Sequence, residues 1–395
     1  MFQSKGWAAL NRLALFSLCL LALASCATPK EAPLVAGGTS EQAFRTAKLV
    51  PPPGSDYARF GHSVATDGET VVVGAWGHEA ESGAAYVFEA SPEGWQRTAL
   101  LRPDDAAQGA RFGYSLDVEG NTIAVGAIYE ASRGHDAGAV YVFERAGGQW
   151  QRTAKLLPPG EAEDDHFGRS VSLAGARLAV GAPGAGKVHT FVRAADGWRT
   201  EEVIEGDSET LRFGTSLALD DTTLAIGAWT EAPEAKGLVV VLERTADGWS
   251  EVQRLRASEG GDRFGYSVGL DGNLLAVGAP DAEDGPMVRL FERVDGVWRE
   301  KQAALPLAHS PELGYTVALF ESSLLVGDPG FAAAADHAGQ VVLAGAGAPA
   351  ALLPGQLPEG SSFGVSLAAA GPLIVVGATG DGSSGQAAGA AYIFY

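Results

Sequence analysis

The chain has 395 residues, of which 46% are apolar, and a formal net charge of −20 at neutral pH. Such an acidic chain repels nucleic acid and anionic headgroups, so nucleic-acid binding is excluded and partners are expected to be basic or neutral. The two cysteines are Cys19 and Cys26. Both lie at the N-terminus, so the folded part has no disulfide and its stability must come from an apolar core.

The first residues of the chain have the pattern of an export signal. Lys5 and Arg12 are followed by the apolar run 13–23, which is too short to span a bilayer as a helix. Leu23-Ala24-Ser25-Cys26 resembles a bacterial lipobox, in which Cys26 becomes the lipidated first residue. The alternative is an ordinary signal peptide that happens to contain a cysteine.

We therefore expect residues 1–25 to be a lipoprotein signal peptide. Residues 26–43 should comprise the lipidated cysteine and a flexible tether, because they have no hydrophobic period and contain Pro, Gly and small polar residues. Three acyl chains would anchor the protein firmly in a membrane. Ala27 after the cysteine fits sorting to the outer membrane. The expected location is the cell envelope, at the outer membrane or the cell surface.

A repeated pair of glycines is the main feature of the remaining chain. Seven times a Phe-Gly pair, once replaced by Leu-Gly, is followed 13 residues later by a second glycine, while the distance between repeats varies from 46 to 55 residues. The pairs are Gly61/Gly74, Gly113/Gly126, Gly168/Gly181, Gly214/Gly227, Gly265/Gly278, Gly314/Gly327 and Gly364/Gly377. A rigid unit with variable connections indicates an array of equal supersecondary pieces.

Each repeat predicts four antiparallel strands. In the first repeat, strand 63–66 is joined through Asp67-Gly68, a strong hairpin signal, to the apolar run 71–74. A loop then leads to a third strand at 84–89, which is followed by an alternating outer strand at 95–100. Third strands recur at 139–144, 188–193, 239–244, 288–293 and 390–395, and outer strands restart at Trp150, Trp198, Trp249 and Trp298.

Seven such units predict an all-β fold, a seven-bladed β-propeller of four-stranded antiparallel blades. The last repeat ends at Tyr395 after its third strand and lacks an outer strand. Segment 44–52 matches segment 151–159, which holds the outer strand of another repeat, almost residue for residue. Strand 44–50 is therefore expected to complete the last blade and close the ring, so that one propeller domain spans 44–395.

This pattern resembles the FG-GAP repeat, best known from the seven-bladed propeller of integrin α subunits. The motif residues are Phe-Gly at 60, 112, 167, 213, 264 and 363 and Gly-Ala at 74, 126, 181, 227, 278 and 377. The chain is most similar to the bacterial variant with short hairpins and a Trp-led outer strand, which is often found on exported proteins. Repeat 6 departs from the pattern at Leu313-Gly314 and Gly327-Asp328-Pro329, so its blade is expected to be the least regular.

The calcium sites of the integrin propellers are not expected in this chain. Several integrin hairpins carry an Asp-x-Asp-x-Asp-Gly loop, which the present hairpins lack. Two-residue turns such as Asp67-Gly68 cannot wrap Ca²⁺, which prefers six to eight oxygen ligands. No cofactor is therefore expected. The acidic runs Asp281-Ala282-Glu283-Asp284 and Glu163-Asp164-Asp165-His166 remain weak candidates for holding a cation, because they lack the alternating spacing.

Two motif matches are better explained by the repeat itself. Residues 181–187 satisfy G-x-x-x-x-G-K, but Val188 follows where a phosphate loop needs Ser or Thr and then a helix. A hydroxyl residue also follows each Phe-Gly pair after one intervening residue: Ser63, Ser115, Ser170, Ser216, Ser267, Thr316 and Ser366. A nucleophile would break the repeat, so these hydroxyls are expected to form structural hydrogen bonds near the channel.

Loops on one face of the propeller carry the residues that break the repeat. Loops between second and third strands and loops between blades emerge on the same face. By the predicted boundaries they hold 26 of the 48 acidic residues and 9 basic ones, a net charge of −17. Loops carry function more often than scaffolds do, so this face is expected to bind the ligand. The alternative is that long loops are polar for solubility alone.

Aromatic residues mark two positions on this face. Exposed aromatics suit a sugar or a partner side chain, whereas packing between loops is the alternative. Those that follow the second-strand glycine are Trp76, Tyr129 and Trp229. Those that follow the Phe-Gly pair, near the rim of the channel, are Tyr114, Tyr266 and Tyr315. With the acids Asp281, Glu283 and Asp284, these six residues form the predicted ligand-binding face.

We expect a monomeric, membrane-anchored module that binds a protein or a glycan, in adhesion or as a scaffold, without catalytic activity. The alternative is a polysaccharide-active lyase or hydrolase with its site at the mouth of the channel. A convergent trio of non-repeating Asp, His, Tyr or Arg residues in one pocket would favour that alternative. The sequence shows no such trio, and convergence in space is not visible in a sequence.

Overall fold

The computed structural model describes residues 44–395 except positions 106, 209, 230–236, 257–262, 282–286, 302–309, 322, 333–335 and 346–348. The signal peptide and tether predicted for residues 1–43 lie outside the described residues. Within the described part of the chain, no helix is long and apolar enough to cross a bilayer.

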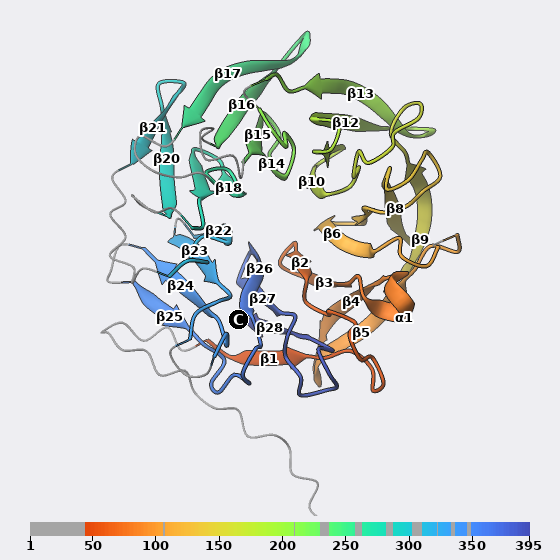
Figure 1. Cartoon of the computed structure of the whole chain (residues 1–395), viewed down its shortest axis with the longest axis vertical. Coiled ribbons are helices and arrows are strands. Elements are labelled where there is room, and N and C mark those ends of the chain that lie inside the picture. The colour runs from red at the N-terminus through yellow and green to blue at the C-terminus, as the bar shows by residue number, and fades with distance from the viewer. Residues whose placement is uncertain are drawn as a thin grey trace, which may run out of the picture. The chain divides into compact units, whose positions relative to one another are not determined.

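Seven four-stranded antiparallel sheets are arranged as blades around a central channel (Figure 1). Blade 1 comprises β2 (Ser63–Thr66), β3 (Thr70–Ala75), β4 (Ala84–Ser91) and β5 (Gly94–Leu101). Blade 2 comprises β6 (Phe112–Glu119), β7 (Thr122–Ala127), β8 (Ala139–Ala146) and β9 (Gln149–Leu156). Blade 3 comprises β10 (Ser170–Ala174), β11 (Arg177–Ala182), β12 (Lys187–Ala194) and β13 (Gly197–Glu205). Blades 4 and 5 comprise β14 (Ser216–Leu219), β15 (Thr223–Ala228), β16 (Leu238–Thr245), β17 (Gly248–Arg256); and β18 (Ser267–Asp271), β19 (Leu274–Gly278), β20 (Val288–Val294), β21 (Val297–Lys301). Blade 6 comprises β22 (Thr316–Phe320), β23 (Ser323–Asp328), β24 (Gln340–Ala344) and β25 (Ala350–Leu352).

The N-terminal strand completes the last blade, as predicted. Blade 7 has the order β1-β28-β27-β26, with β1 at Thr46–Leu49, β26 at Phe363–Ala370, β27 at Leu373–Ala378 and β28 at Ala390–Phe394. Strand β1 runs antiparallel to β28, with Thr46 opposite Phe394 and Leu49 opposite Ala391. In Figure 1 the first strand lies along the outer edge of the last blade. The predicted seven-bladed propeller and its closure are therefore confirmed.

The apolar core lies between neighbouring blades. Phe60, from the first Phe-Gly pair, is fully buried and packs edge-on against Tyr86 and Phe88 of its own blade. The same cluster includes Val375 and Ile393 of blade 7. The equivalent phenylalanine or leucine is buried in every other blade. Each Phe-Gly pair therefore supplies one large side chain to an interface between blades, which explains why the fold repeats it.

Close packing of the backbone explains the constant spacing of the two glycines. Ser63 lies directly opposite Gly74 in the β2–β3 pairing, and a Cβ atom on Gly74 would lie 2.2 Å from both the Ser63 hydroxyl and the carbonyl oxygen of Gly113. Gly61 has a φ of +87°, a conformation that glycine adopts without strain. The second glycine therefore leaves room for a hydroxyl to reach the next blade.

A closed ring of hydrogen bonds results. Each hydroxyl after a Phe-Gly pair donates to the carbonyl oxygen of the Phe-Gly or Leu-Gly glycine in the next blade, at 2.7 to 3.0 Å. The pairs are Ser63–Gly113, Ser115–Gly168, Ser170–Gly214, Ser216–Gly265, Ser267–Gly314, Thr316–Gly364 and Ser366–Gly61. The last bond returns to blade 1. The structural role expected for these hydroxyls is confirmed.

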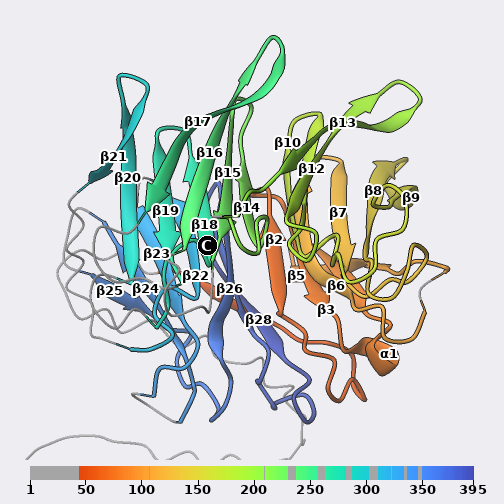
Figure 2. The ribbon, with the colours of Figure 1, turned by 45° about the horizontal axis from the view of Figure 1, so that its top comes forward.

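The two kinds of long loop share one face of the ring, here named the loop face. The backbone N–H of Arg111, before β6, donates to the carbonyl oxygen of Glu81 in the β3–β4 loop, and that of Phe112 donates to Ser82. The same β3–β4 loop contains the only helix among the described residues, the single turn α1 (His78–Glu81). In Figure 2 the β12–β13 and β16–β17 hairpins project from the end of the ring opposite α1.

Blade 6 is the least regular, as expected from its altered motif. Its outer strand β25 pairs with β24 at three positions, whereas the outer strand β9 of blade 2 pairs with β8 at seven. Leu313 occupies the place of the motif phenylalanine and is 4% exposed. The smaller side chain and the short edge strand both reduce the apolar surface that this blade can bury.

Candidate functional site

A cavity of about 270 Å³ lies in the central channel, lined by the seven inner strands. Three rings of residues line it. The ring closest to the loop face contains the residue after each Phe-Gly or Leu-Gly pair: His62, Tyr114, Arg169, Thr215, Tyr266, Tyr315 and Val365. Next comes the ring of hydroxyls, followed by a ring of valines and leucines. The first ring, here named the mouth ring, is where equal repeats carry unequal side chains.

Arg169 is the cation of the mouth ring. Its guanidinium lies 5.0 Å from the centre of the Tyr114 ring, and the residue is only partly exposed. Among the described residues no carboxylate lies within ion-pair distance of it. Its positive charge lowers the pKa of both His62 and Tyr266, so it lies within electrostatic reach of both side chains. An arginine in this setting is available to an anion.

His62 is a neutral imidazole at physiological pH. Burial is the main cause that lowers its pKa to about 3, and the charges of Arg169, Arg111 and Arg59 lower it further. Its ring centre lies 4.6 Å from that of Tyr114 and 5.9 Å from that of Trp76. His62 therefore contributes a polar ring without charge, and the mouth ring keeps the positive charge of Arg169.

Tyr266 and Tyr315 form the opposite part of the mouth ring. Their ring centres are 5.0 Å apart, and that of Tyr266 lies 5.3 Å from the centre of Trp229. Burial, followed by the charge and hydrogen bond of Tyr315, raises the pKa of Tyr266 well above its usual value. The Tyr266 phenol is therefore neutral at physiological pH. The sequence prediction that Tyr114, Tyr266 and Tyr315 lie near the channel rim agrees with this geometry.

The second group of predicted aromatics packs against arginines. Arg111 lies over the rings of Trp76 and Tyr129, at 4.4 and 4.7 Å from their centres. Arg212 lies 4.6 Å from the centre of the Trp229 ring. Trp229 is 5% exposed, which corrects the expectation that it is open at the surface. Cation–π contacts of this kind hold the arginines that precede Phe-Gly pairs, so these aromatics pack against the residues next to the mouth.

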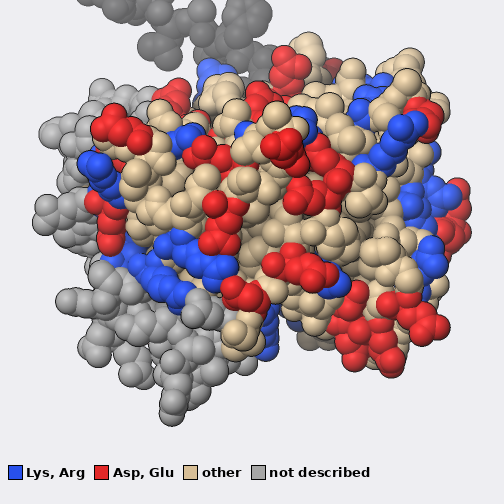
Figure 3. All heavy atoms as spheres, turned by 90° about the horizontal axis from the view of Figure 1, so that it is seen from above, with Lys and Arg blue, Asp and Glu red and all other residues tan. Residues whose placement is uncertain are grey.

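Ion pairs occupy many of the acids on the loop face. Glu81 pairs with Arg111 at 2.8 Å, and Asp281 pairs with Arg263 at 2.6 Å. Glu283 and Asp284, predicted beside Asp281, lie outside the described residues. Figure 3 shows acidic and basic side chains interspersed on the side of the molecule that faces the viewer. The net charge of −17 counted from the sequence therefore includes acids that are already neutralised locally.

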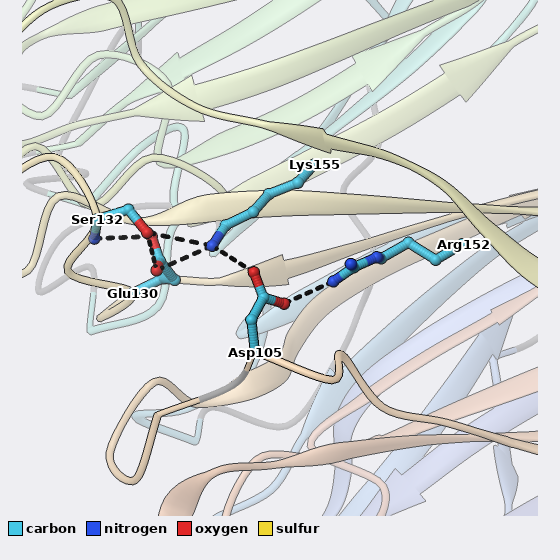
Figure 4. A network of polar contacts seen from close by, with 5 residues as sticks. All are labelled: Asp105, Glu130, Ser132, Arg152 and Lys155. Carbon is cyan, nitrogen blue, oxygen red and sulfur yellow. Dashed lines mark hydrogen bonds and ion pairs between the residues drawn. The ribbon is translucent and has the colours of Figure 1, made fainter.

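One such network joins three segments of blade 2 (Figure 4). Lys155 Nζ lies 2.9 Å from a carboxylate oxygen of Asp105 and 3.1 Å from one of Glu130. It also donates to the hydroxyl of Ser132 at 3.1 Å, while Arg152 pairs with the other oxygen of Asp105. The network fixes both loops of the blade to its outer strand and leaves Glu130, 5% exposed, without access to a ligand.

The second predicted acidic run has one member in a cluster. Asp164 lies 3.0 Å from Nδ1 of His135, which is also 3.6 Å from Asp136, and ligand atoms of all three lie within 4.8 Å of one another. His135 and Asp164 are well exposed. Exposed carboxylates beside a histidine form this arrangement without a metal, and the cluster is explained by these ion pairs.

The sequence analysis did not identify His62 and Arg169. The signal was present, because both residues occupy the position after a Phe-Gly pair at which the tyrosines were noted. A larger cavity, about 580 Å³, lies on the opposite side between blades 7 and 1, and Trp95, Leu373 and Tyr395 contribute to its lining. Its lining includes the cation Arg145, but that guanidinium is already paired with Glu89 at 2.8 Å.

Comparison with known families agrees with this architecture. Five segments match the family model described as "FG-GAP repeat": residues 44–88, 95–143, 150–194, 249–288 and 350–394. The chain belongs to the FG-GAP repeat family. Each matched segment of this FG-GAP protein begins with the outer strand of one blade and continues into the first strands of the next blade. In the first segment that outer strand is β1. No match covers strands β14 to β16 of blade 4 or strands β22 to β24 of blade 6.

No curated protein matches this FG-GAP chain. Among solved structures, 449 chains match. One of them is described as a "putative 6-phosphogluconolactonase" from Bacteroides uniformis. It is 14% identical in sequence, with a TM-score of 0.44, and the match covers 60% of the present chain and 68% of that chain.

Proposed function

We propose that this FG-GAP protein is a binding module of the cell envelope, which is held by a lipid on Cys26 and binds its ligand at the mouth of the propeller channel. The observation that supports binding there is the convergence of His62, Arg169 and three tyrosines on one cavity. The hydroxyl ring directly below has one residue type in six of seven blades. A position used only for stability would be equally uniform, so the variety of the mouth ring favours a ligand.

A second candidate function is a lyase acting on an acidic sugar. In such an elimination a base takes the proton beside the carboxylate, a double bond forms as the C–O bond on the next carbon breaks, and the leaving oxygen takes a proton. His62 is the candidate base, Arg169 the partner of the carboxylate, and a tyrosine the proton donor. A histidine, an arginine and a tyrosine in one pocket are the kind of convergent, non-repeating trio that would favour an enzyme according to the sequence analysis.

The low pKa of His62 favours a binding function over catalysis. General bases work best when their pKa lies near the pH of the reaction. Burial and three nearby arginines hold the pKa of His62 at about 3, which makes the imidazole a weak base. The binding function therefore has better support from the electrostatics of the mouth than the lyase does.

Capture from an envelope extract tests the proposal. We would compare the full-length protein with a variant that combines Tyr266→Ala and Tyr315→Ala, and with the control Arg199→Gln, whose side chain is exposed on the β12–β13 hairpin. A ligand held by the wild type and the control, and lost by the double variant, supports binding at the mouth. Equal capture by all three proteins contradicts it. Formation of an unsaturated sugar product during incubation favours the lyase.

A further inference from the structure

We propose that the mouth of the channel binds one carboxylate-bearing sugar ring, a uronic acid, with Arg169 pairing with the carboxylate and the tyrosines packing against the ring. The inference rests on the proposed function and names the ligand class of the same site. Three properties of the mouth support it: a cation that pairs with no carboxylate among the described residues, a polar and aromatic lining, and a size that admits a single ring.

The cation is the first argument. A charged group removed from water is costly unless it is paired, and two other arginines near the mouth are paired with carboxylates. Arg111 pairs with Glu81, and Arg263 pairs with Asp281. Arg169 has no such carboxylate among the described residues. A carboxylate on the ligand matches the planar guanidinium through two parallel hydrogen bonds.

The lining of the cavity is the second argument. Tyr114 lies between His62 and Arg169, and Tyr266 lies against Tyr315 farther round the same ring, so aromatic rings line two parts of the cavity. Rings suit the C–H faces of a sugar. Below them each hydroxyl of the hydroxyl ring donates its proton to a backbone carbonyl. Its oxygen keeps its acceptor capacity and can receive a hydrogen bond from a sugar hydroxyl.

The size and surroundings of the site are the third argument. A volume of about 270 Å³ lies just below the range of about 300 to 1,000 Å³ typical of ligand pockets, which favours one ring over a longer chain. The acidic loops around the mouth would repel a polyanion. The net charge of the chain predicted a basic or neutral partner for the whole binding face, and the present inference differs in giving the mouth a ligand with a single negative charge.

Calorimetric titration of the full-length protein tests the ligand class. The probes are glucuronate and galacturonate, each beside its neutral counterpart, glucose or galactose. We expect at least one acid to bind at least tenfold more tightly than its neutral counterpart, and Arg169→Gln to remove that preference. Arg199→Gln, on the opposite face, should keep it. A disaccharide with the acid at its non-reducing end then shows whether a free acid or a chain end is preferred.

Clear outcomes would overturn the inference. If neither acid binds more tightly than its neutral counterpart, or if Arg169→Gln retains the preference, the ligand class is wrong. Should Arg169→Gln fail to fold, Tyr315→Phe supplies a second test, because loss of one phenol hydroxyl should weaken binding of the acid and the neutral sugar alike. If the protein captures a ligand from the envelope extract at the mouth but binds no uronate in the titration, the proposed function stands and the uronic acid is rejected as its ligand. If Tyr266→Ala binds uronate as tightly as the wild type does, the uronate site lies outside the mouth and the inference is wrong.

Discussion

Lys48 Nζ lies 2.8 Å from Oδ2 of Asp381, and this ion pair joins the first strand of the propeller to a loop of its last blade. Asp381 is fully buried, and it also accepts hydrogen bonds from Ser383 and from the hydroxyl of Tyr392. Blade 2 has the same arrangement within a continuous chain, where Lys155 contacts Glu130, Ser132 and the ring of Tyr141. The ring is therefore closed by a contact that an ordinary blade also uses.

Replacing Lys48 should destabilise the whole propeller. In Lys48→Met the buried carboxylate of Asp381 loses its cation but keeps two hydroxyl donors, so we expect a loss of about 2–4 kcal/mol in the free energy of unfolding. Denaturant unfolding followed by tryptophan fluorescence measures it. The control Lys155→Met removes the equivalent amine from blade 2. A Lys48→Met protein as stable as the wild type would show that the ion pair contributes nothing to closure.

Deletion of residues 41–50 is a stronger test of the same closure. It removes β1, so β28 becomes an exposed edge and Ala391 and Phe394 lose their opposite residues. We expect a melting temperature lower by at least 10 °C, or a failure to fold. An unchanged melting temperature would mean that the ring is stable without its N-terminal strand.

The closure could be predicted from the sequence because a propeller repeats its units. Segment 44–52 resembles segment 151–159, which contains an outer strand, and the last repeat lacks an outer strand. The N-terminal segment therefore had to be the missing strand of the last blade. The resemblance extends to chemistry, since Lys48 and Lys155 occupy equal positions and make equal contacts. The partners Asp381 and Glu130 each stand four residues after the second glycine of their repeat, with a serine two residues later, a correspondence that the sequence analysis did not use.

The second glycine of each repeat should not tolerate a side chain. A Cβ atom on Gly126 would lie 2.2 Å from the carbonyl oxygen of Gly168 and 2.4 Å from the hydroxyl of Ser115. Gly126→Ala must therefore separate blades 2 and 3, and we expect a loss of about 2–4 kcal/mol in thermal or denaturant unfolding. The control Gly382→Ala meets its nearest atom at 3.7 Å. Equal stability of both variants would contradict the packing explanation of the 13-residue spacing.

The candidate site was only partly predictable. The repeat identified Tyr114, Tyr266 and Tyr315, because a regular fold places equal positions in one ring around the axis. It did not show that Arg169 lies among them with no carboxylate partner in the part of the chain that the structure describes, since pairing depends on loop conformations that vary between blades. For the same reason Trp76, Tyr129 and Trp229 could not be recognised as supports for Arg111 and Arg212.

Membrane attachment should depend on Cys26. Replacing the cysteine by serine removes the atom that would carry the lipid, and the apolar run 13–23 is too short to serve as a transmembrane anchor. We expect Cys26→Ser to move from the membrane fraction to the soluble fraction of cell extracts. The control Cys19→Ser, within the predicted signal peptide, should remain with the membrane. Retention of Cys26→Ser with lipid would reject the lipobox.

The stability of the propeller should respond to the ionisation of Asp117 in the channel wall. Burial is the main cause that raises the pKa of this carboxyl to about 7, although it accepts backbone hydrogen bonds from Leu173 and Val118. Its unfolded pKa is about 3.9, so the folded state binds the proton more tightly. The stability this provides is complete below pH ~4 and is lost as the pH rises through 7.

Asp117→Asn removes this titration and should therefore gain stability relative to the wild type between pH 4 and 8, by about 1 kcal/mol or more. Asp381→Asn is the control with the opposite sign. Burial of Asp381 opposes ionisation, yet Lys48, Ser383 and Tyr392 together hold its pKa below the usual value. Its contribution is present above the unfolded pKa and lost in acid, so Asp381→Asn should cost most at neutral pH. Unfolding curves from pH 4 to 8 that shift in parallel for wild type and Asp117→Asn would show that Asp117 ionises normally.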